Sequence, residues 1–197
     1  MTQDLVFALM GFAFATSVTP GPNNMMLLAS GANFGLRRTV PHMLGISVGH
    51  LVMVFLVGLG LAGLFQAEPR LFVALKVVSV AYMLWLAWKI ATAAPPRAGD
   101  VAGKPFSLVQ AAAFQWVNPK AWAMALTAVT VYAPGGEVGT TAVVAVVFAM
   151  VNLPSVAVWA AAGQALRRGL DTRRRLRAFN VTMAVLLVLS LWPVLAH

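Results

Sequence analysis

The sequence predicts an all-α polytopic membrane protein with six transmembrane helices, arranged as two inverted three-helix repeats in which the first and fourth helices are broken. Three observations lead to this fold class. Hydrophobic residues make up 60% of the chain and charged residues only 10%. Six long apolar segments divide the chain, and interruptions that contain proline lie in the first and fourth of them. Together they favour a fold whose solvent is lipid rather than water.

The low charge of the chain argues against an ordinary water-soluble domain. Soluble domains carry about 25% charged residues, and this chain of 197 residues has too few to cover its surface. The net charge of +9 does not indicate a nucleic-acid partner, because the basic residues lie between apolar segments and form no stripe with interleaved aromatic residues. Cysteine is absent, which excludes a disulfide framework and a thiolate site.

Six apolar segments are long enough to cross a bilayer. A helix rises about 1.5 Å per residue, so roughly 20 apolar residues span a hydrocarbon core of about 30 Å. The segments cover residues 4–34, 41–64, 71–92, 106–131, 139–166 and 178–195. We therefore treat residues 1–197 as a single transmembrane domain, with one repeat over residues 1–92 and a second over residues 106–197.

The basic residues predict the orientation of the chain. Most of the 14 Lys and Arg residues follow the first, third and fifth segments, which places them on one side of the membrane. They include Arg37 and Arg38, Lys89 and Lys104, and the arginines within residues 167–177. Because loops rich in Lys and Arg stay in the cytoplasm, both termini are predicted to lie outside it.

The first segment contains the run Thr19-Pro20-Gly21-Pro22-Asn23-Asn24. Each proline removes a backbone donor and clashes with the preceding turn, and the glycine between them adds backbone freedom. The segment is also too long for one straight span, because about 30 helical residues extend roughly 45 Å. A break near the middle of the segment accounts for both facts.

The fourth segment has a corresponding interruption, Asn118-Pro119-Lys120. Pro20 and Pro119 lie half a chain apart, each in the first helix of a three-helix half. An odd number of helices places the second half upside down in the membrane. Interrupted helices at matching positions mark the binding site of inverted-repeat transporters.

Two further polar residues extend the repeat to the second and fifth segments. His50 and Asn152 are again separated by about half the chain, and Pro154 predicts a further break in the fifth segment. A rise of about 1.5 Å per residue places both polar residues near the middle of the membrane. His50 is a candidate proton carrier, although a hydrogen bond between helices is the more ordinary role of such a histidine.

The interruptions provide groups that suit a carboxylate ligand. A broken helix exposes N–H groups at a partially positive end, and amide side chains supply donors and acceptors. Lys120 is too deep to reach the membrane surface easily, and a deep cation indicates a functional site with the substrate's carboxylate as its partner. The candidate substrate-binding residues are Thr19, Pro20, Gly21, Pro22, Asn23, Asn24, Asn118, Pro119, Lys120 and Asn152.

Structural interpretations of the same residues stay open. Proline in a membrane helix is often only a kink, and Asn23 or Asn24 can simply bond the carbonyl groups that a break sets free. The sequence contains no nucleophile–base pair, metal-binding motif or phosphate-binding loop. Catalytic residues, a bound metal and a cofactor are therefore not expected.

Three motifs follow one another in an order that is typical of a known family. They are Thr19-Pro20-Gly21-Pro22-Asn23, then Gly45 and Gly49 after Arg37 and Arg38, then Phe114 followed by Asn118-Pro119-Lys120-Ala121. In these motifs, in length and in number of helices, the chain resembles the LysE/RhtB family of amino-acid exporters over essentially its whole extent. Residues 81–92 further resemble the cysteine and O-acetylserine exporter branch of that family.

The resemblance implies a secondary transporter of a bacterial inner membrane that exports small amino acids or their derivatives and uses the proton gradient. Its partners would be a small amino acid and membrane lipid, and association into a homo-oligomer is left open. Inverted halves predict alternating access. Proton-driven carriers usually use a deep Asp or Glu, which this chain lacks. A proton would therefore travel on His50, on Lys120 or on the substrate, and facilitated export without a coupled proton stays open.

Other function classes stay open beside export. An anion or metal-ion carrier or channel of related architecture is the first. A metal path requires deep carboxylates or clustered histidines, which the sequence lacks, whereas an anion suits Lys120 and exposed helix N-termini as well as an amino acid does. A membrane enzyme or structural subunit is the second, without any motif in its favour.

Overall fold

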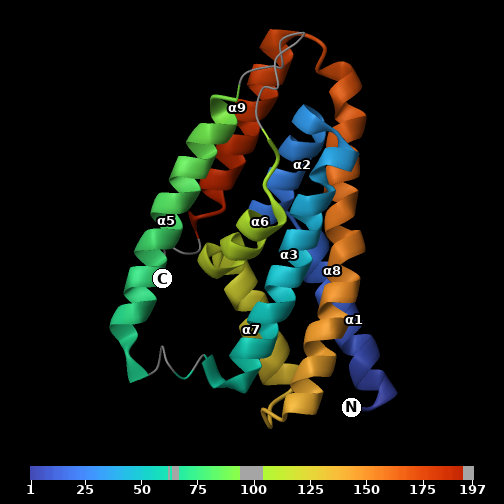
Figure 1. The fold of residues 1–197 in the computed structure, drawn as a ribbon, viewed down its shortest axis with the longest axis vertical. Helices are drawn as coiled ribbons and strands as arrows, with labels where there is room; N and C mark the ends of the chain where they lie inside the picture. The colour runs from blue at the N-terminus through green and yellow to red at the C-terminus, as the bar shows by residue number, and fades with distance from the viewer. Residues whose placement is uncertain (62, 64–66, 94–103, 193–197) are drawn as a thin grey trace.

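The computed structural model describes residues 1–61, 63, 67–93 and 104–192. These residues form helices and connections, and no strand occurs among them. In chain order the helices are α1 (Gln3–Val18), α2 (Pro22–Phe34), α3 (Leu36–Leu56), η1 (Val57–Leu61), α5 (Pro69–Ala91), α6 (Leu108–Phe114), η2 (Gln115–Val117), α7 (Pro119–Tyr132), α8 (Val138–Leu166), η3 (Arg167–Gly169) and α9 (Arg173–Leu189). Figure 1 shows them as an elongated helical bundle.

The helices are consistent with a polytopic membrane protein, although not all six predicted spans are confirmed. α3 with η1, α5, and α8 with η3 are each long and apolar enough to cross a membrane, and α1 with α2 forms a fourth, bent span. In the part of the chain that the structure describes, α9 and the helices on either side of Asn118 are shorter. Six spans and the inverted repeat therefore stay predictions.

The predicted break in the first segment is confirmed. α1 ends at Val18, α2 begins at Pro22, and the two helices are bent by 58°. Thr19 has an extended backbone (φ −65°, ψ 144°), the conformation that a following proline favours. Pro22 stands in the first turn of α2, where its missing N–H costs no intrahelical bond.

The fourth segment is interrupted at the predicted position. Asn118 has an extended backbone (φ −95°, ψ 107°), again before a proline, and Pro119 begins α7. The Asn118 side chain caps α7 by accepting a hydrogen bond from the Lys120 N–H at 3.1 Å. In Figure 1 the chain rises from α1 to α2 and descends from α6 to α7, so the two broken segments run in opposite directions.

Pro154 does not break the fifth segment. α8 runs without interruption from Val138 to Leu166 with Pro154 inside it, so the predicted third break is wrong. A single proline removes only one backbone hydrogen bond, and a membrane helix can continue where neighbouring groups satisfy the backbone.

The second helix begins earlier than predicted. α3 starts at Leu36, because Gly35 (φ 83°) turns the chain directly after α2. The Leu36 N–H then donates to the Gln164 side chain of α8 at 2.6 Å, which satisfies a group at the start of the helix. Pro41, the predicted first residue, consequently lies inside the helix.

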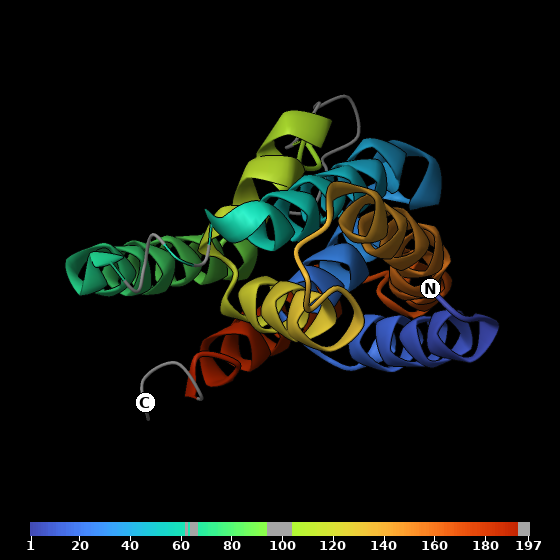
Figure 2. The same cartoon turned by 90° about the horizontal axis from the view of Figure 1, so that it is seen from below.

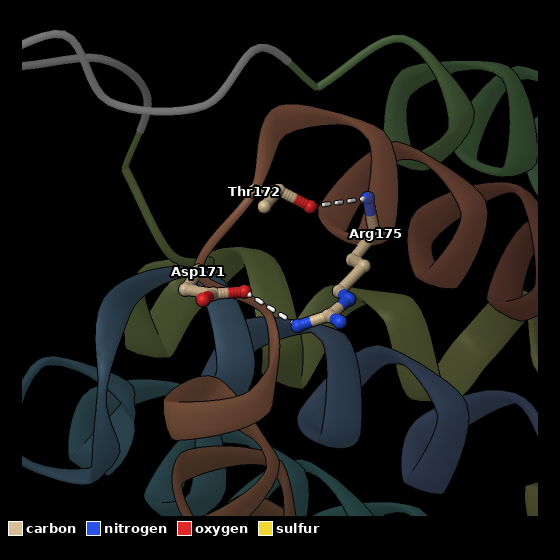
Figure 3. A network of polar contacts seen from close by, with 3 residues as sticks. All are labelled: Asp171, Thr172 and Arg175. Atoms are coloured by element: carbon tan, nitrogen blue, oxygen red, sulfur yellow. Dashed lines mark hydrogen bonds and ion pairs between the residues drawn. The ribbon is translucent and has the colours of Figure 1, made fainter.

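The sixth helix also begins early, within the basic connection rather than at residue 178. Its first residue is Arg173. Figure 3 shows the local reason: the Thr172 Oγ1 accepts a hydrogen bond from the Arg175 N–H at 3.3 Å, and the Arg175 guanidinium pairs with Asp171 at 2.9 Å. Because an ion pair this exposed contributes little, the threonine cap fixes where the helix starts.

α8 is the central helix of the bundle, with α1, α2 and α3 packed along it. Gly31 of α2 faces the backbone of Ala160, and Gly163 of α8 faces the backbone of Leu28. The two helices therefore meet backbone to backbone, as small residues allow in membranes. α5 packs mainly on α9, and this pair lies to one side of the other helices (Figures 1 and 2).

One end of the bundle gathers the basic residues. The turn between α2 and α3, the last turn of α5, η3 and the start of α9 lie at the same end, the top in Figure 1. The start of α1 and the connection from α7 to α8 lie at the opposite end. This grouping is what the orientation prediction requires, and the orientation itself stays a prediction.

Candidate functional site

Lys120 joins the two helix breaks. It lies in the first turn of α7, and its Nζ donates to the Thr19 carbonyl oxygen at 2.7 Å, to the Thr19 Oγ1 at 2.9 Å and to the Pro20 carbonyl oxygen at 3.4 Å. Thr19 and Pro20 directly follow the last residue of α1, so no further helical turn uses their carbonyl oxygens. The first break thus supplies acceptors and the second supplies the cation.

A second link between the breaks is a pair of amides. The Asn23 amide donates to the Gln115 Oε1 at 2.9 Å, and the Gln115 amide donates back to the Asn23 Oδ1 at 3.2 Å. Gln115 also donates to the Ala111 carbonyl of α6 at 2.9 Å, which holds its side chain in place. α2 and η2 are therefore tied together directly beside the breaks.

Asn24 bonds the carbonyl groups that the first break sets free. Its amide donates to the carbonyl oxygens of Ser17 at 2.8 Å and of Thr19 at 2.7 Å. The structural interpretation that the sequence left open for this residue is therefore observed. Asn24 acts as a brace across the bend between α1 and α2.

Asn152 occupies the centre of a buried hydrogen-bond chain. Its amide donates to the Ser17 hydroxyl of α1 at 2.9 Å, and its Oδ1 accepts from the Ser47 hydroxyl of α3 at 2.9 Å. All three residues are less than 5% exposed. α8 is thereby connected to α1 and α3.

His50 lies beside this chain on α3 and is almost fully buried. Its ring centroid is 4.7 Å from that of Phe148. Its Nε2 has no hydrogen-bond partner among the described residues. A buried polar atom normally has one, so this nitrogen is available to water or to a ligand.

These groups surround a small central cavity. It has about 20 Å³ of free volume, enough for one water molecule. Its lining residues are Thr16, Ser17, Gly21, Asn23, Asn24, His50, Gln115, Asn118, Lys120, Ala121, Met124, Asn152 and Val156. The site predicted from two distant stretches of sequence therefore comes together in space.

The three predicted prolines line a different cavity. Pro20, Pro22 and Pro119 face a space of about 610 Å³ on the side of α5, which Lys120 also lines. The prolines thus shape the breaks, while their neighbours supply the polar groups of the central cavity. Thr19 takes part through its bonds to Lys120.

Sequence reasoning missed Thr16, Ser17 and Gln115. Gln115 is the most informative omission, because it lies in an apolar segment only three residues before Asn118. A polar side chain at membrane depth is itself a signal of function. Ser17 was harder to find, since its role depends on Asn152 of a distant helix.

The site is cationic, and among the described residues no Asp or Glu lines it. Among the described residues the one ion pair joins Asp171 and Arg175, far from the breaks in sequence, so Lys120 has only neutral acceptors there. No cluster of three or more metal-binding side chains occurs in the described part of the chain. The arrangement suits an anionic group that would replace the carbonyl oxygens around Lys120.

The chain is similar to known proteins over most of its length. The model of the LysE type translocator family matches residues 14–190. The cysteine/O-acetylserine efflux proteins of Escherichia coli (strain K12) and Shigella sonnei (strain Ss046) are each 33% identical to the chain over 190 residues. Each alignment covers 95% of this chain and 96% of the relative. No solved structure matches the chain significantly.

Proposed function

The chain belongs to the LysE-type translocators, which are transporters and not enzymes, and on this premise we propose that it exports small amino acids or their derivatives from the cytoplasm. It is a multi-pass protein, and the origin of its relatives fits the bacterial inner membrane. Cysteine and O-acetylserine are the first candidate substrates, because the relatives' names specify them. The amide-lined site would recognise the amino and carboxylate groups that all amino acids share.

The contact between Lys120 and Thr19 carries the proposal. It places an intramembrane ammonium group, without an acidic neighbour in the described residues, at the meeting point of two broken helices. The substrate's carboxylate takes the place of the Thr19 and Pro20 oxygens at Lys120. The amides of Asn23, Asn118 and Asn152 then bind the remaining polar groups of the substrate.

The small size of the central cavity supports alternating access. A space of about 20 Å³ holds one water and no amino acid, so the helices around the breaks must separate to load the site. The hydrogen bonds of Lys120 and the amide pair of Asn23 and Gln115 join the two broken segments that would have to separate. In the proposed cycle, repeats 1–92 and 106–197 rock against each other and open the site to each side in turn.

His50 is the proposed carrier of a coupled proton. It lines the central cavity, and its unpartnered Nε2 can accept a proton there. No Asp or Glu lines this cavity in the described part of the chain. The proton therefore enters the cycle on an imidazole rather than on a carboxylate.

The test is transport by inside-out vesicles that contain the purified protein. A panel of labelled amino acids, including cysteine and O-acetylserine, is offered with and without a pH gradient in which the vesicle interior is acidic. We expect uptake of at least one small amino acid, with stimulation by the gradient. Uptake of chloride or acetate without any amino acid would instead favour the anion carrier, for which Lys120 is equally suited.

A further inference from the structure

A cavity separate from the two described above, called here the second cavity, lies between α2, α3, α5 and the residues that lead into α6. Its volume is about 260 Å³, against about 20 Å³ for the central cavity. Drug-sized ligands occupy pockets of roughly 300–1,000 Å³, so this one suits a smaller molecule. None of the proposed substrate-binding residues lines it.

His42 marks this cavity as a ligand site. The side chain lines the cavity and is 2% exposed, yet neither ring nitrogen has a hydrogen-bond partner among the described residues. One face of its ring is covered by Phe106 at a centroid distance of 5.3 Å. Because buried polar atoms are rarely left unpaired, the two nitrogens indicate a group that occupies the cavity.

The charge of the cavity points to an anion. Lys89 and Lys104 both line it, and no Asp or Glu does so within the described residues. Lys89 is held over the Trp85 ring at 4.7 Å, which restricts where its ammonium group lies. Apolar side chains such as Phe34 and Leu86 complete the wall. A carboxylate joined to a short organic group matches this combination.

One face of α2 connects this cavity with the central one. Asn23 lines the central cavity, whereas Met26, Ser30 and Asn33 line the second. Spacings of three and four residues place all four on the same helical face. Ser30 and Asn33 follow Asn23 by seven and ten residues, which corresponds to about 10–15 Å along the helix. The second cavity is therefore displaced from the breaks toward the basic end of the bundle.

We propose that this cavity binds the carboxylate of a small amino acid on the cytoplasmic side, before the substrate reaches the central site. The identity of the ligand rests on the proposed function. Lys89 and Lys104 attract the anion, and His42 donates a hydrogen bond at the bottom of the cavity. Met26, a flexible buried side chain that lines the cavity, lies in α2 between Asn23 of the central cavity and Ser30 of this one.

The test measures transport of labelled O-acetylserine by the full-length protein in sealed proteoliposomes and binding by the same protein in nanodiscs. We expect His42→Leu and the double variant Lys89→Gln/Lys104→Gln to raise the half-saturating cytoplasmic concentration for transport about tenfold while the maximal rate is kept. A tenfold change in affinity corresponds to about 1.4 kcal/mol. Arg70→Gln, at the other end of α5, is the matched control and should change neither quantity. Unchanged half-saturation in both test variants would overturn the proposal.

Two further arms separate this site from its alternatives. Thermal stabilisation of the wild-type protein by acetate, lost in His42→Leu and in the lysine double variant, supports the site even if no amino acid is exported. Binding in phosphatidylcholine nanodiscs that is abolished by phosphatidylglycerol would assign the cavity to a lipid headgroup and overturn the proposal. Stabilisation of His42→Leu equal to that of the wild type by acetate would overturn it as well.

Discussion

The Nζ of Lys120 and the carbonyl oxygen of Thr19 are 2.7 Å apart, although 101 residues separate them in the chain. This contact closes the gap between two interrupted helices with a charge on one side and neutral acceptors on the other. A substrate carboxylate is a stronger partner for an ammonium group than a carbonyl is. The Lys120–Thr19 contact can therefore link the two broken helices when no substrate is bound, and a substrate carboxylate can replace it.

Replacing Lys120 with Ala should abolish export while the protein still inserts in the membrane. Loss of a hydrogen bond to a charged group costs about 1.5–3 kcal/mol, or roughly ten- to hundredfold in binding. Export of labelled O-acetylserine, normalised to protein in the membrane fraction, measures the effect. Lys76→Ala is the control, because Lys76 lines only the larger cavity beside α5. Normal export by a well-inserted Lys120 variant would remove this residue from the site.

Replacing Gly21 with Ala should slow export without unfolding the protein. The new Cβ would lie 2.7 Å from the Lys120 Cδ and 3.1 Å from its Nζ, so the lysine must move away from Thr19. The backbone at Gly21 is extended (φ 179°) and accepts alanine without strain. Gly11→Ala, which meets nothing within 4 Å, is the matched control in α1. Equal transport rates in the two variants would contradict the expectation.

Replacing Gly163 with Ala should destabilise the contact between α2 and α8. A Cβ at this position would overlap the backbone of Leu28, which cannot rotate away as a side chain can. Overpacking typically costs about 1–3 kcal/mol. The free energy of unfolding in mixed micelles measures the loss. Gly139→Ala, on the same helix and with open space around it, should stay close to the wild type.

The hydrogen bond between Asn152 and Ser47 should appear as an interaction energy. Replacing Ser47 with Ala removes this bond of about 1 kcal/mol, the usual size in a membrane, and replacing Asn152 with Ala removes it together with the bond to Ser17. Since both changes break the same bond, the double variant should lose less stability than the two single variants added together. The free energies of unfolding of the wild type, the two single variants and the double variant, measured in mixed micelles, give the interaction energy. Strict additivity would show that the bond contributes nothing.

The predicted orientation can be read from single introduced cysteines, because the native chain has none. Arg38→Cys and Arg174→Cys lie at the basic end and should resist a membrane-impermeant thiol reagent in intact cells. Glu137→Cys, in the connection at the opposite end, should react. All three should react after the membrane is permeabilised. The reverse pattern in intact cells would invert the topology.

Much of the fold and part of the site were predictable because the signals are local. The two proline interruptions act on their own and the preceding residues, so the breaks could be placed from sequence. The same rule failed at Pro154, where one proline in a well-packed helix does not stop it. The difference lies in the surroundings of the helix, which a short stretch of sequence does not specify.

The sequence by itself determined that the chain has the composition of a membrane protein, that two of its helical segments are broken, and that Lys120 lies at one break. These follow from hydrophobicity and backbone chemistry, which depend on neighbouring residues in the chain. Only the tertiary structure decided that Lys120 bonds Thr19, that Gln115 pairs with Asn23, and that His42 lies in a second cavity with no hydrogen-bond partner among the described residues. Such relationships arise when helices distant in sequence pack together, because packing rather than local propensity selects the partner of each buried polar group.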